Sequence, residues 1–226
     1  MLNIASELHK LRQGLPECPS LETASPDTDA LYVTKRTRQL ERLPKLGHLR
    51  YLAAAELAEH HFDIICSATQ VTHLEVNVLP VKSLGALGAM KNLRVLSLYE
   101  GKKITALTGI EALANLEALS LANFAVSVSL EPLASCARLR TLWLSGTTWK
   151  PMRVPSLQPL ACLTKLERLM LPSVRVEDKK LTPLHSLTKL SEAKLPNFFA
   201  ASEFAAFAAA VPGARGKWLE FHAGKV

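Results

Sequence analysis

Apolar residues recur along the chain in a frame that repeats about every 22 to 24 residues. In residues 130–144, core positions fall at every third residue up to Leu139, and the last two, Leu142 and Leu144, are two apart. A period of three is typical of a tight 3-10 turn and a period of two of a strand. Such a unit cannot bury its apolar side alone, so the units must stack into a solenoid.

The frame predicts eight short strands, and seven of them have an aliphatic residue larger than Ala two places after their first apolar position. Those first positions are Leu31, Leu52, Leu74, Leu96, Leu119, Leu142, Leu169 and Ala193. Their spacings are 21, 22, 22, 23, 23, 27 and 24 residues. The long unit therefore carries an insertion, which falls within residues 147–155.

The frame predicts one solenoid domain over residues 1–226, with repeats over 30–197 between an N-terminal cap (1–29) and a C-terminal cap (198–226). Terminal repeats need caps because the last layer otherwise exposes its leucines. We expect an amphipathic helix over residues 3–12 and a loop over 16–29 at the first end. A helix over 202–211 and an edge strand over 216–221 are expected at the second.

One repeat departs from the three-residue frame. Residues 53–62 are rich in Ala and Glu and contain no Gly or Pro, which predicts an α-helix on the convex side. Elsewhere that side holds Pro132, Pro159 and Pro183, each directly before a core Leu. Proline suits the first position of a short turn, because it fixes φ and lacks an N–H.

Composition favours a reducing compartment and a basic surface toward the C-terminus. The net charge is +7, and residues 114–226 hold 14 basic against 8 acidic residues while residues 1–113 hold 13 against 12. The four cysteines lie far apart and form no CxxC pair, as expected of free thiols. No signal peptide or membrane span is evident, so we expect a cytoplasmic protein, with a monomer as the simplest assembly.

The LxxLxxLxxLxL frame resembles the leucine-rich repeat family over roughly residues 40–197. The Leu-x-Pro-Leu units, as at Pro159 and Pro183, look like the short bacterial subclass found in internalins. The resemblance implies an α/β fold, a curved horseshoe with a parallel concave sheet and short helices or 3-10 turns on the convex side. It also implies a role in recognising proteins.

The sequence lacks the Asn ladder that this family carries five residues after the first strand leucine. The positions hold Leu57, Leu79, Gly101, Phe124, Thr147, Val174 and Phe198. In the family the Asn side chain satisfies backbone groups in the tight turn after each strand. We expect altered turns or water to take over that task here.

Alternation in the strands assigns the residues between buried leucines to the concave face. Two clusters result, one mixed and acid-leaning toward the N-terminus and one aromatic and basic toward the C-terminus. The first contains Tyr51, His73, Glu75, Tyr99 and Glu100, and the second contains Trp143, Arg168, Met170 and Lys194. Trp143 is the leading candidate because Trp, Tyr and Arg dominate interface hot spots, although it can also serve as surface cover over Met170 and Arg168.

Trp149, in the Pro-framed insertion of residues 147–155, is a second candidate contact. Binding residues favour loops held by rigid scaffolds. The alternative, which we favour from sequence, is that Trp149 folds back over the edge of the core.

The pattern as a whole predicts a protein–protein interaction module or adaptor that binds an unknown protein through its concave sheet. An alternative is binding of nucleic acid or another acidic surface through the basic C-terminal half, although the basic residues are spread over many turns. The residues Glu59, His60 and His61 lie near Asp63, Cys66 and His73, but their spacing matches no established zinc site. We expect no metal, no cofactor and no enzymatic activity, since no catalytic motif occurs.

Overall fold

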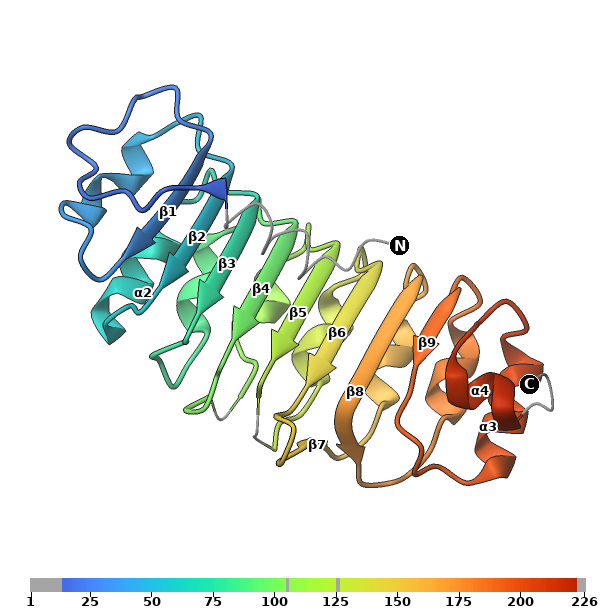
Figure 1. The fold of residues 1–226 in the computed structure, drawn as a ribbon. Helices are drawn as coiled ribbons and strands as arrows, with labels where there is room; N and C mark the ends of the chain where they lie inside the picture. Colours follow the sequence, from blue (N-terminus) through green and yellow to red (C-terminus); the bar gives the residue numbers. More distant parts are fainter. Residues whose placement is uncertain (1–13, 105, 125–126, 223–226) are drawn as a thin grey trace.

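The computed structural model describes residues 14–104, 106–124 and 127–222. The predicted helix over residues 3–12 lies outside that range. Consecutive parallel strands form one long, twisted sheet, backed on one side by short helical turns (Figure 1). The strands are β1 Ala30–Thr34, β2 Tyr51–Ala55, β3 His73–Asn77, β4 Val95–Tyr99, β5 Ala118–Ala122, β6 Thr141–Ser145, β7 Met152–Val154, β8 Arg168–Val176 and β9 Glu192–Lys194.

The pairing register confirms the alignment read from the leucine frame. Leu31, Leu52 and Leu74 are direct partners across β1, β2 and β3, and the same row continues to Ala193 in β9. These side chains fill the core between the sheet and the convex turns. A one-residue slip would turn every one of them to the other face, so the apolar pattern fixes the register.

The three-residue period appears in the backbone as a chain of turn hydrogen bonds. Leu133, Cys136 and Leu139 each donate an N–H to the carbonyl of the core residue three places earlier, over 2.9 Å. The convex 3-10 turns that result span Leu40–Lys45, Gly85–Ala89, Ile110–Ala112, Glu131–Ser135, Gln158–Cys162 and Thr182–Ser186. Proline is the second residue of each of the last three, one place after the predicted first position but still in the first turn.

The predicted helix over residues 53–62 is wrong in its position. Ala53, Ala54 and Ala55 belong to β2, and the helix α2 is Glu59–Cys66. Pairing on both sides of β2 overrides the helical propensity of the alanines, because Leu52 must occupy its core slot. A left-handed Glu56, with a φ of 51°, turns the chain out of the strand before α2 begins.

The same left-handed turn replaces the missing Asn ladder. Glu56, Val78, Glu100 and Asn123 all have φ between 51° and 60°, and each directly precedes a ladder position. The buried side chains at those positions include Leu79 and Phe124, whose N–H groups donate to the carbonyls of Tyr99 and Ser145 in the next repeat. Backbone groups of the neighbouring repeat thus satisfy these two N–H groups, and altered turns stand at the first four ladder positions.

The C-terminal end differs from the prediction in one element. Helix α3 is Ala201–Ala210, as the sequence indicated, but residues 216–221 fall mainly in a second helix, α4, Lys217–His222, and not in an edge strand. Strand pairing stops after a single bridge between Glu192 and Arg215. The short helix buries Leu219 against the end of the stack.

Candidate binding surface on the concave sheet

The predicted concave residues lie in straight rows across the sheet. One row runs Tyr51, His73, Val95, Ala118, Thr141, Arg168 and Glu192, and the next runs Ala53, Glu75, Ser97, Ser120, Trp143, Met170 and Lys194. Adjacent strands are about 4.8 Å apart, so neighbours within a row touch. The structure therefore brings the members of each predicted cluster together, apart from Tyr99 and Glu100 at the strand exits.

The C-terminal cluster is the more open of the two. Trp143 and Met170 are direct cross-strand partners, and Met170 is the partner of Lys194. Trp143 and Met170 are partly exposed and Lys194 is exposed. Arg168 donates from Nε to the hydroxyl of Thr141 over 3.1 Å, which holds its guanidinium beside the row. An indole, a thioether and two cations thus share one stretch of surface.

The N-terminal cluster is largely closed. Tyr51 and Glu75 are 7% exposed, and the Tyr51 hydroxyl donates to Glu75 Oε2 over 3.3 Å. Leu15 and Tyr32 are among the residues that pack against Tyr51. Sequence alternation assigned the correct face to these side chains, but it carried no information about what lies over that face.

Two other members of that cluster also have partners within the chain. Burial lowers the pKa of His73, and Arg94 lowers it further while Glu117 acts in the opposite direction. Its Nδ1 is 2.8 Å from the Thr72 hydroxyl. Tyr99 is 40% exposed at the end of β4 and accepts a hydrogen bond from the side chain of Asn123.

Small side chains separate the two clusters. Ser97 and Ser120 are cross-strand partners between Glu75 and Trp143, with Ala118 and Ala122 on the same strand as Ser120. Trp143 therefore has a small side chain as its partner on one side and Met170 on the other. Ser97 and Ser120 are buried, at 8% and 2% exposed, whereas Trp143 is partly exposed.

Trp149 lies away from the concave face, in the turn that follows β6. Its side chain is 93% exposed, so the expectation that it folds back over the core is wrong. Met152 of the same insertion fills the core position instead, in the extra strand β7.

Sequence reasoning missed a row of side-chain amides at the edge where the strands begin. Gln70 donates to the carbonyls of Leu43 and Leu46, Asn92 to Thr69, and Asn115 to Lys91. These amides all lie four residues before the first apolar strand position, a regularity visible in the sequence. They tie each convex turn to the preceding one.

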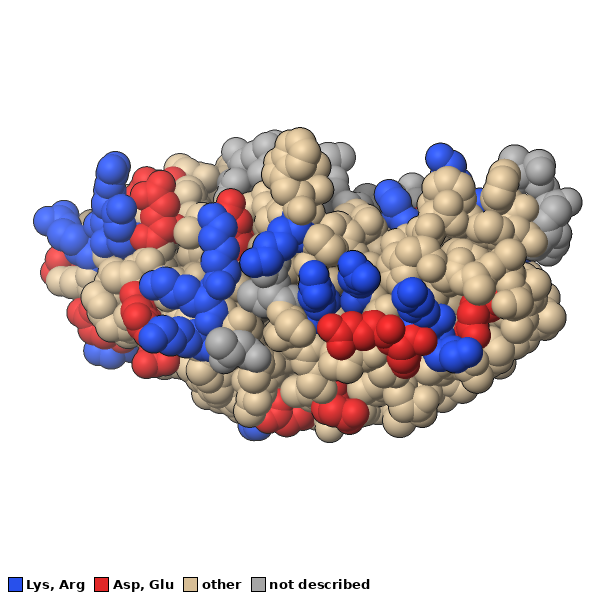
Figure 2. Space-filling view, turned by 90° about the horizontal axis from the view of Figure 1, so that it is seen from below, with Lys and Arg blue, Asp and Glu red and all other residues tan. Residues whose placement is uncertain are grey.

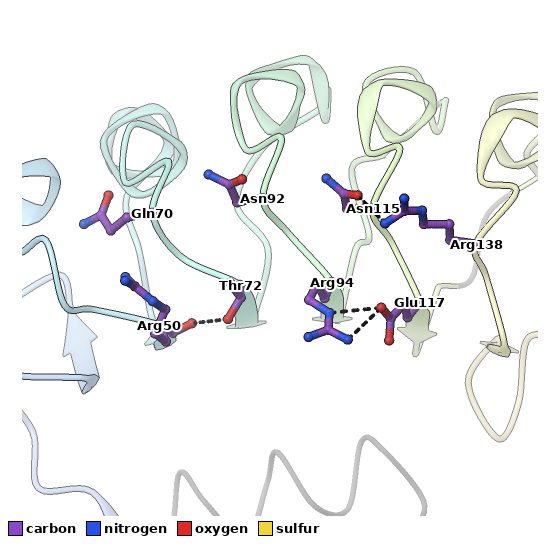
Figure 3. A pocket seen from close by; sticks show the side chains of 8 residues that line it. All are labelled: Arg50, Gln70, Thr72, Asn92, Arg94, Asn115, Glu117 and Arg138. Atoms are coloured by element: carbon purple, nitrogen blue, oxygen red, sulfur yellow. Dashed lines mark hydrogen bonds and ion pairs between the residues drawn. The ribbon is translucent and has the colours of Figure 1, made fainter.

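A polar groove of about 480 Å³ runs along this row of amides (Figure 3). Arg94 reaches across it with Nε and Nη2, 3.0 and 2.8 Å from Glu117 Oε1. Arg140 makes the equivalent pair with Glu167 at 3.0 and 2.6 Å. Arg94 and Arg140 are thus committed to carboxylates of the next repeat, while Arg138 donates to the side chain of Asn115.

The residues considered for a metal do not converge. The described residues contain no group of three His, Cys, Asp or Glu side chains arranged to hold an ion. Burial raises the pKa of the Cys66 thiol to about 12, with a further contribution from Asp63. Cys66 is therefore a protonated core residue and a poor ligand.

No protein-family model matches the chain, and a search of curated proteins found no match. Solved structures do resemble it. An internalin, InlF, from Listeria monocytogenes aligns with a TM-score of 0.63 at 19% identity, over 83% of this chain and 56% of that one. Internalin C2 from the same organism aligns with a TM-score of 0.56 at 23% identity, over 77% and 74%. The fold is that of a leucine-rich repeat protein.

The leucine-rich repeat solenoid also resembles a plant peptide hormone receptor, RGFR1, solved in complex with RGF2. That structure aligns with a TM-score of 0.55 at 14% identity, over 89% of this chain and 37% of the receptor. The chain spans little more than half the length of the InlF structure that it matches. No helix among the described residues is long and apolar enough to cross a membrane.

Proposed function

We propose that this leucine-rich repeat chain is a protein-binding module that holds its partner on the concave sheet, around Trp143. The observation that carries the proposal is the row in which Trp143, Met170 and Lys194 lie side by side, the first two partly exposed and the third exposed. Aromatic, Met and Arg side chains are enriched in interface cores. The similar structure of RGFR1 was solved in complex with RGF2, which supports a binding role for this fold.

The buried thiols and the exposed side chains both favour binding over catalysis. The buried thiols of Cys66 and Cys136 have pKa values raised to about 12 and about 11 by burial, so neither is a nucleophile at neutral pH. Trp143, Met170 and Lys194 supply contact area and charge but no acid–base pair. We therefore propose an adaptor rather than an enzyme.

A reducing compartment is part of the proposal. All four cysteines lie in the described part of the chain, and all are free thiols, with Cys162 exposed. Free thiols persist in the cytoplasm, whereas secreted proteins of this size usually form disulfides. We propose a cytoplasmic location on this ground.

The test is affinity capture with the chain carrying Trp143→Ala and Arg168→Ala. We expect the double variant to lose the partner that the unmodified chain retains, while its thermal unfolding stays close to that of the parent. Phe221→Ala is the matched control, because that ring is 57% exposed on α4, in the C-terminal cap and outside the row. Equal capture by the double variant and the control would remove the concave row as the contact surface.

A further inference from the structure

The four-residue insertion after β6 builds a rigid platform at the edge where the strands end. Thr147 donates its N–H to the Lys150 carbonyl over 2.9 Å, and Lys150 donates its N–H to the Thr147 hydroxyl over 2.9 Å. Ser173 of β8 ties the turn down by donating to the Thr147 carbonyl over 2.9 Å. A turn closed from both ends and anchored to the sheet holds its tip in one place.

Trp149 sits at that tip with 93% of its side chain exposed. Full burial of a large apolar side chain stabilises a folded chain by about 2 kcal/mol or more. The exposed indole of Trp149 does not contribute that stabilisation. An aromatic ring on a rigid turn loses little conformational entropy when it binds, which is the property of an interface anchor. The turn therefore presents Trp149 outward instead of leaving it loose.

A pair of arginines lies next to this turn. Arg153 of β7 and Arg175 of β8 are direct partners across two parallel strands, while Val154 and Val176 point into the core beside them. Both guanidinium groups are exposed, and within the described residues neither forms an ion pair with Asp or Glu. Like charges directly opposite each other destabilise a sheet, so this pair costs the fold stability.

We propose that Trp149, Arg153 and Arg175 form a second binding surface, separate from the concave sheet, for an acidic segment of a partner protein. Paired guanidinium forks hold carboxylates through charge-assisted, bidentate hydrogen bonds. In an extended segment, acidic residues two apart face the same side and stand about 7 Å from each other, a spacing that two long arginine side chains can span by splaying apart from strands about 4.8 Å apart. The exposed indole packs on an apolar side chain next to those acids.

The charges around the pair favour an acidic protein segment over a nucleic acid. Glu177 and Asp178 follow β8 directly and are both exposed. Figure 2 views the molecule toward the ends of the strands, and acidic side chains border the basic ones along that edge. A phosphate backbone follows a continuous basic track, and here the exposed carboxylates of Glu177 and Asp178 would lie beside it. A short acidic segment needs only the two arginines.

The experiment selects random dodecapeptides on the full chain and counter-selects them on the variant R153Q/R175Q. We expect enriched peptides with two or more Asp or Glu residues beside an apolar one. A labelled peptide of the leading sequence should bind about tenfold or more weakly to W149A and to R153Q/R175Q, the loss typical of a hot-spot contact. R36Q/R38Q, which removes two exposed arginines after β1, should bind within about twofold of the parent, as should W143A.

Arg175→Glu separates binding from stability. The new carboxylate faces Arg153, so the chain should unfold at a higher temperature and yet lose the peptide. The proposal is overturned by selected peptides without acidic residues, by equal binding to parent and R153Q/R175Q, or by an oligodeoxythymidylate that displaces the peptide at low concentration with a steep dependence on salt. Loss of peptide binding in W143A would place the site on the concave sheet instead.

Discussion

The carboxylate of Glu203 in α3 accepts a hydrogen bond from the backbone N–H of Leu181, with 2.7 Å between nitrogen and Oε2. Its other oxygen lies 3.1 Å from the ammonium group of Lys180. The two contacts fasten the C-terminal helix to the start of the last convex turn. The hydrogen bond to Leu181 is the main cause of a lowered Glu203 pKa, with Lys180 and His185 contributing.

Glu203→Ala should destabilise the chain by about 1 kcal/mol, because the Leu181 N–H loses a charged acceptor. A depressed carboxyl pKa stabilises the folded state at pH values above the ordinary pKa near 4.5 and loses that effect as the pH falls through the lowered value. Urea unfolding at pH 7 and at pH 3 measures both effects. The difference between variant and parent should shrink at the acidic pH.

Lys180→Gln is the control for this measurement. Its ammonium is largely exposed, so the ion pair to Glu203 contributes little, and the variant should stay within about 0.5 kcal/mol of the parent. If the lysine variant lost as much stability as Glu203→Ala, the ion pair and not the backbone hydrogen bond would hold α3.

Gly146→Ala should distort the turn that carries Trp149. An added Cβ would lie 2.3 Å from the Met152 nitrogen and 2.4 Å from the Lys150 oxygen, and backbone atoms cannot move away cheaply. We expect a loss of about 1–3 kcal/mol in unfolding free energy, together with a change in the fluorescence of Trp149. Gly47→Ala is the matched control, because no atom lies within 4 Å of the position that an added Cβ would take. This variant should have an unfolding free energy that is unchanged or slightly raised.

Thiol labelling should sort the cysteines by burial. Cys162 is exposed and should react quickly with a disulfide reagent in the folded chain. Cys66 and Cys136 should react only on unfolding, since burial raises their pKa values to about 12 and about 11 and excludes the reagent. Cys162→Ser should remove the fast phase and leave the labelling of the partly buried Cys18 and the slow phases, and fast labelling of Cys66 or Cys136 would show that a core layer opens readily.

The side-chain amides of Gln70, Asn92 and Asn115 lie at the edge where the strands begin. They predict an effect on stability that the apolar pattern of the repeats does not. Asn115→Ala removes the bond to the Lys91 carbonyl and the acceptor for Arg138, at 2.9 Å each, and should cost about 0.5–1 kcal/mol given the exposure of the site. Thr188→Ala, an exposed change in the turn between the last convex turn and β9, is the control. Thermal unfolding of the two variants in parallel measures the difference, and equal melting temperatures would show that the row of amides contributes nothing measurable.

The sequence alone determined the repeat, its register and the face on which each strand residue lies. Leu52, Leu74 and the other first strand positions were placed correctly because period and burial are local consequences of which residues are apolar. It also showed that the Asn ladder is missing, since that is a matter of residue identity at fixed positions. The same frame located the insertion of residues 147–155.

Only the tertiary structure decided which of those positions are open. Tyr51 and Glu75 lie on the predicted face but are buried, whereas Trp149 stands exposed on a turn anchored by Ser173 of another strand. Arg153 and Arg175 are cross-strand partners because the extra strand β7 pairs with residues of β8 that lie 22 positions later in the sequence. Exposure and pairing depend on contacts between repeats, and a periodic pattern carries no information about what lies over it.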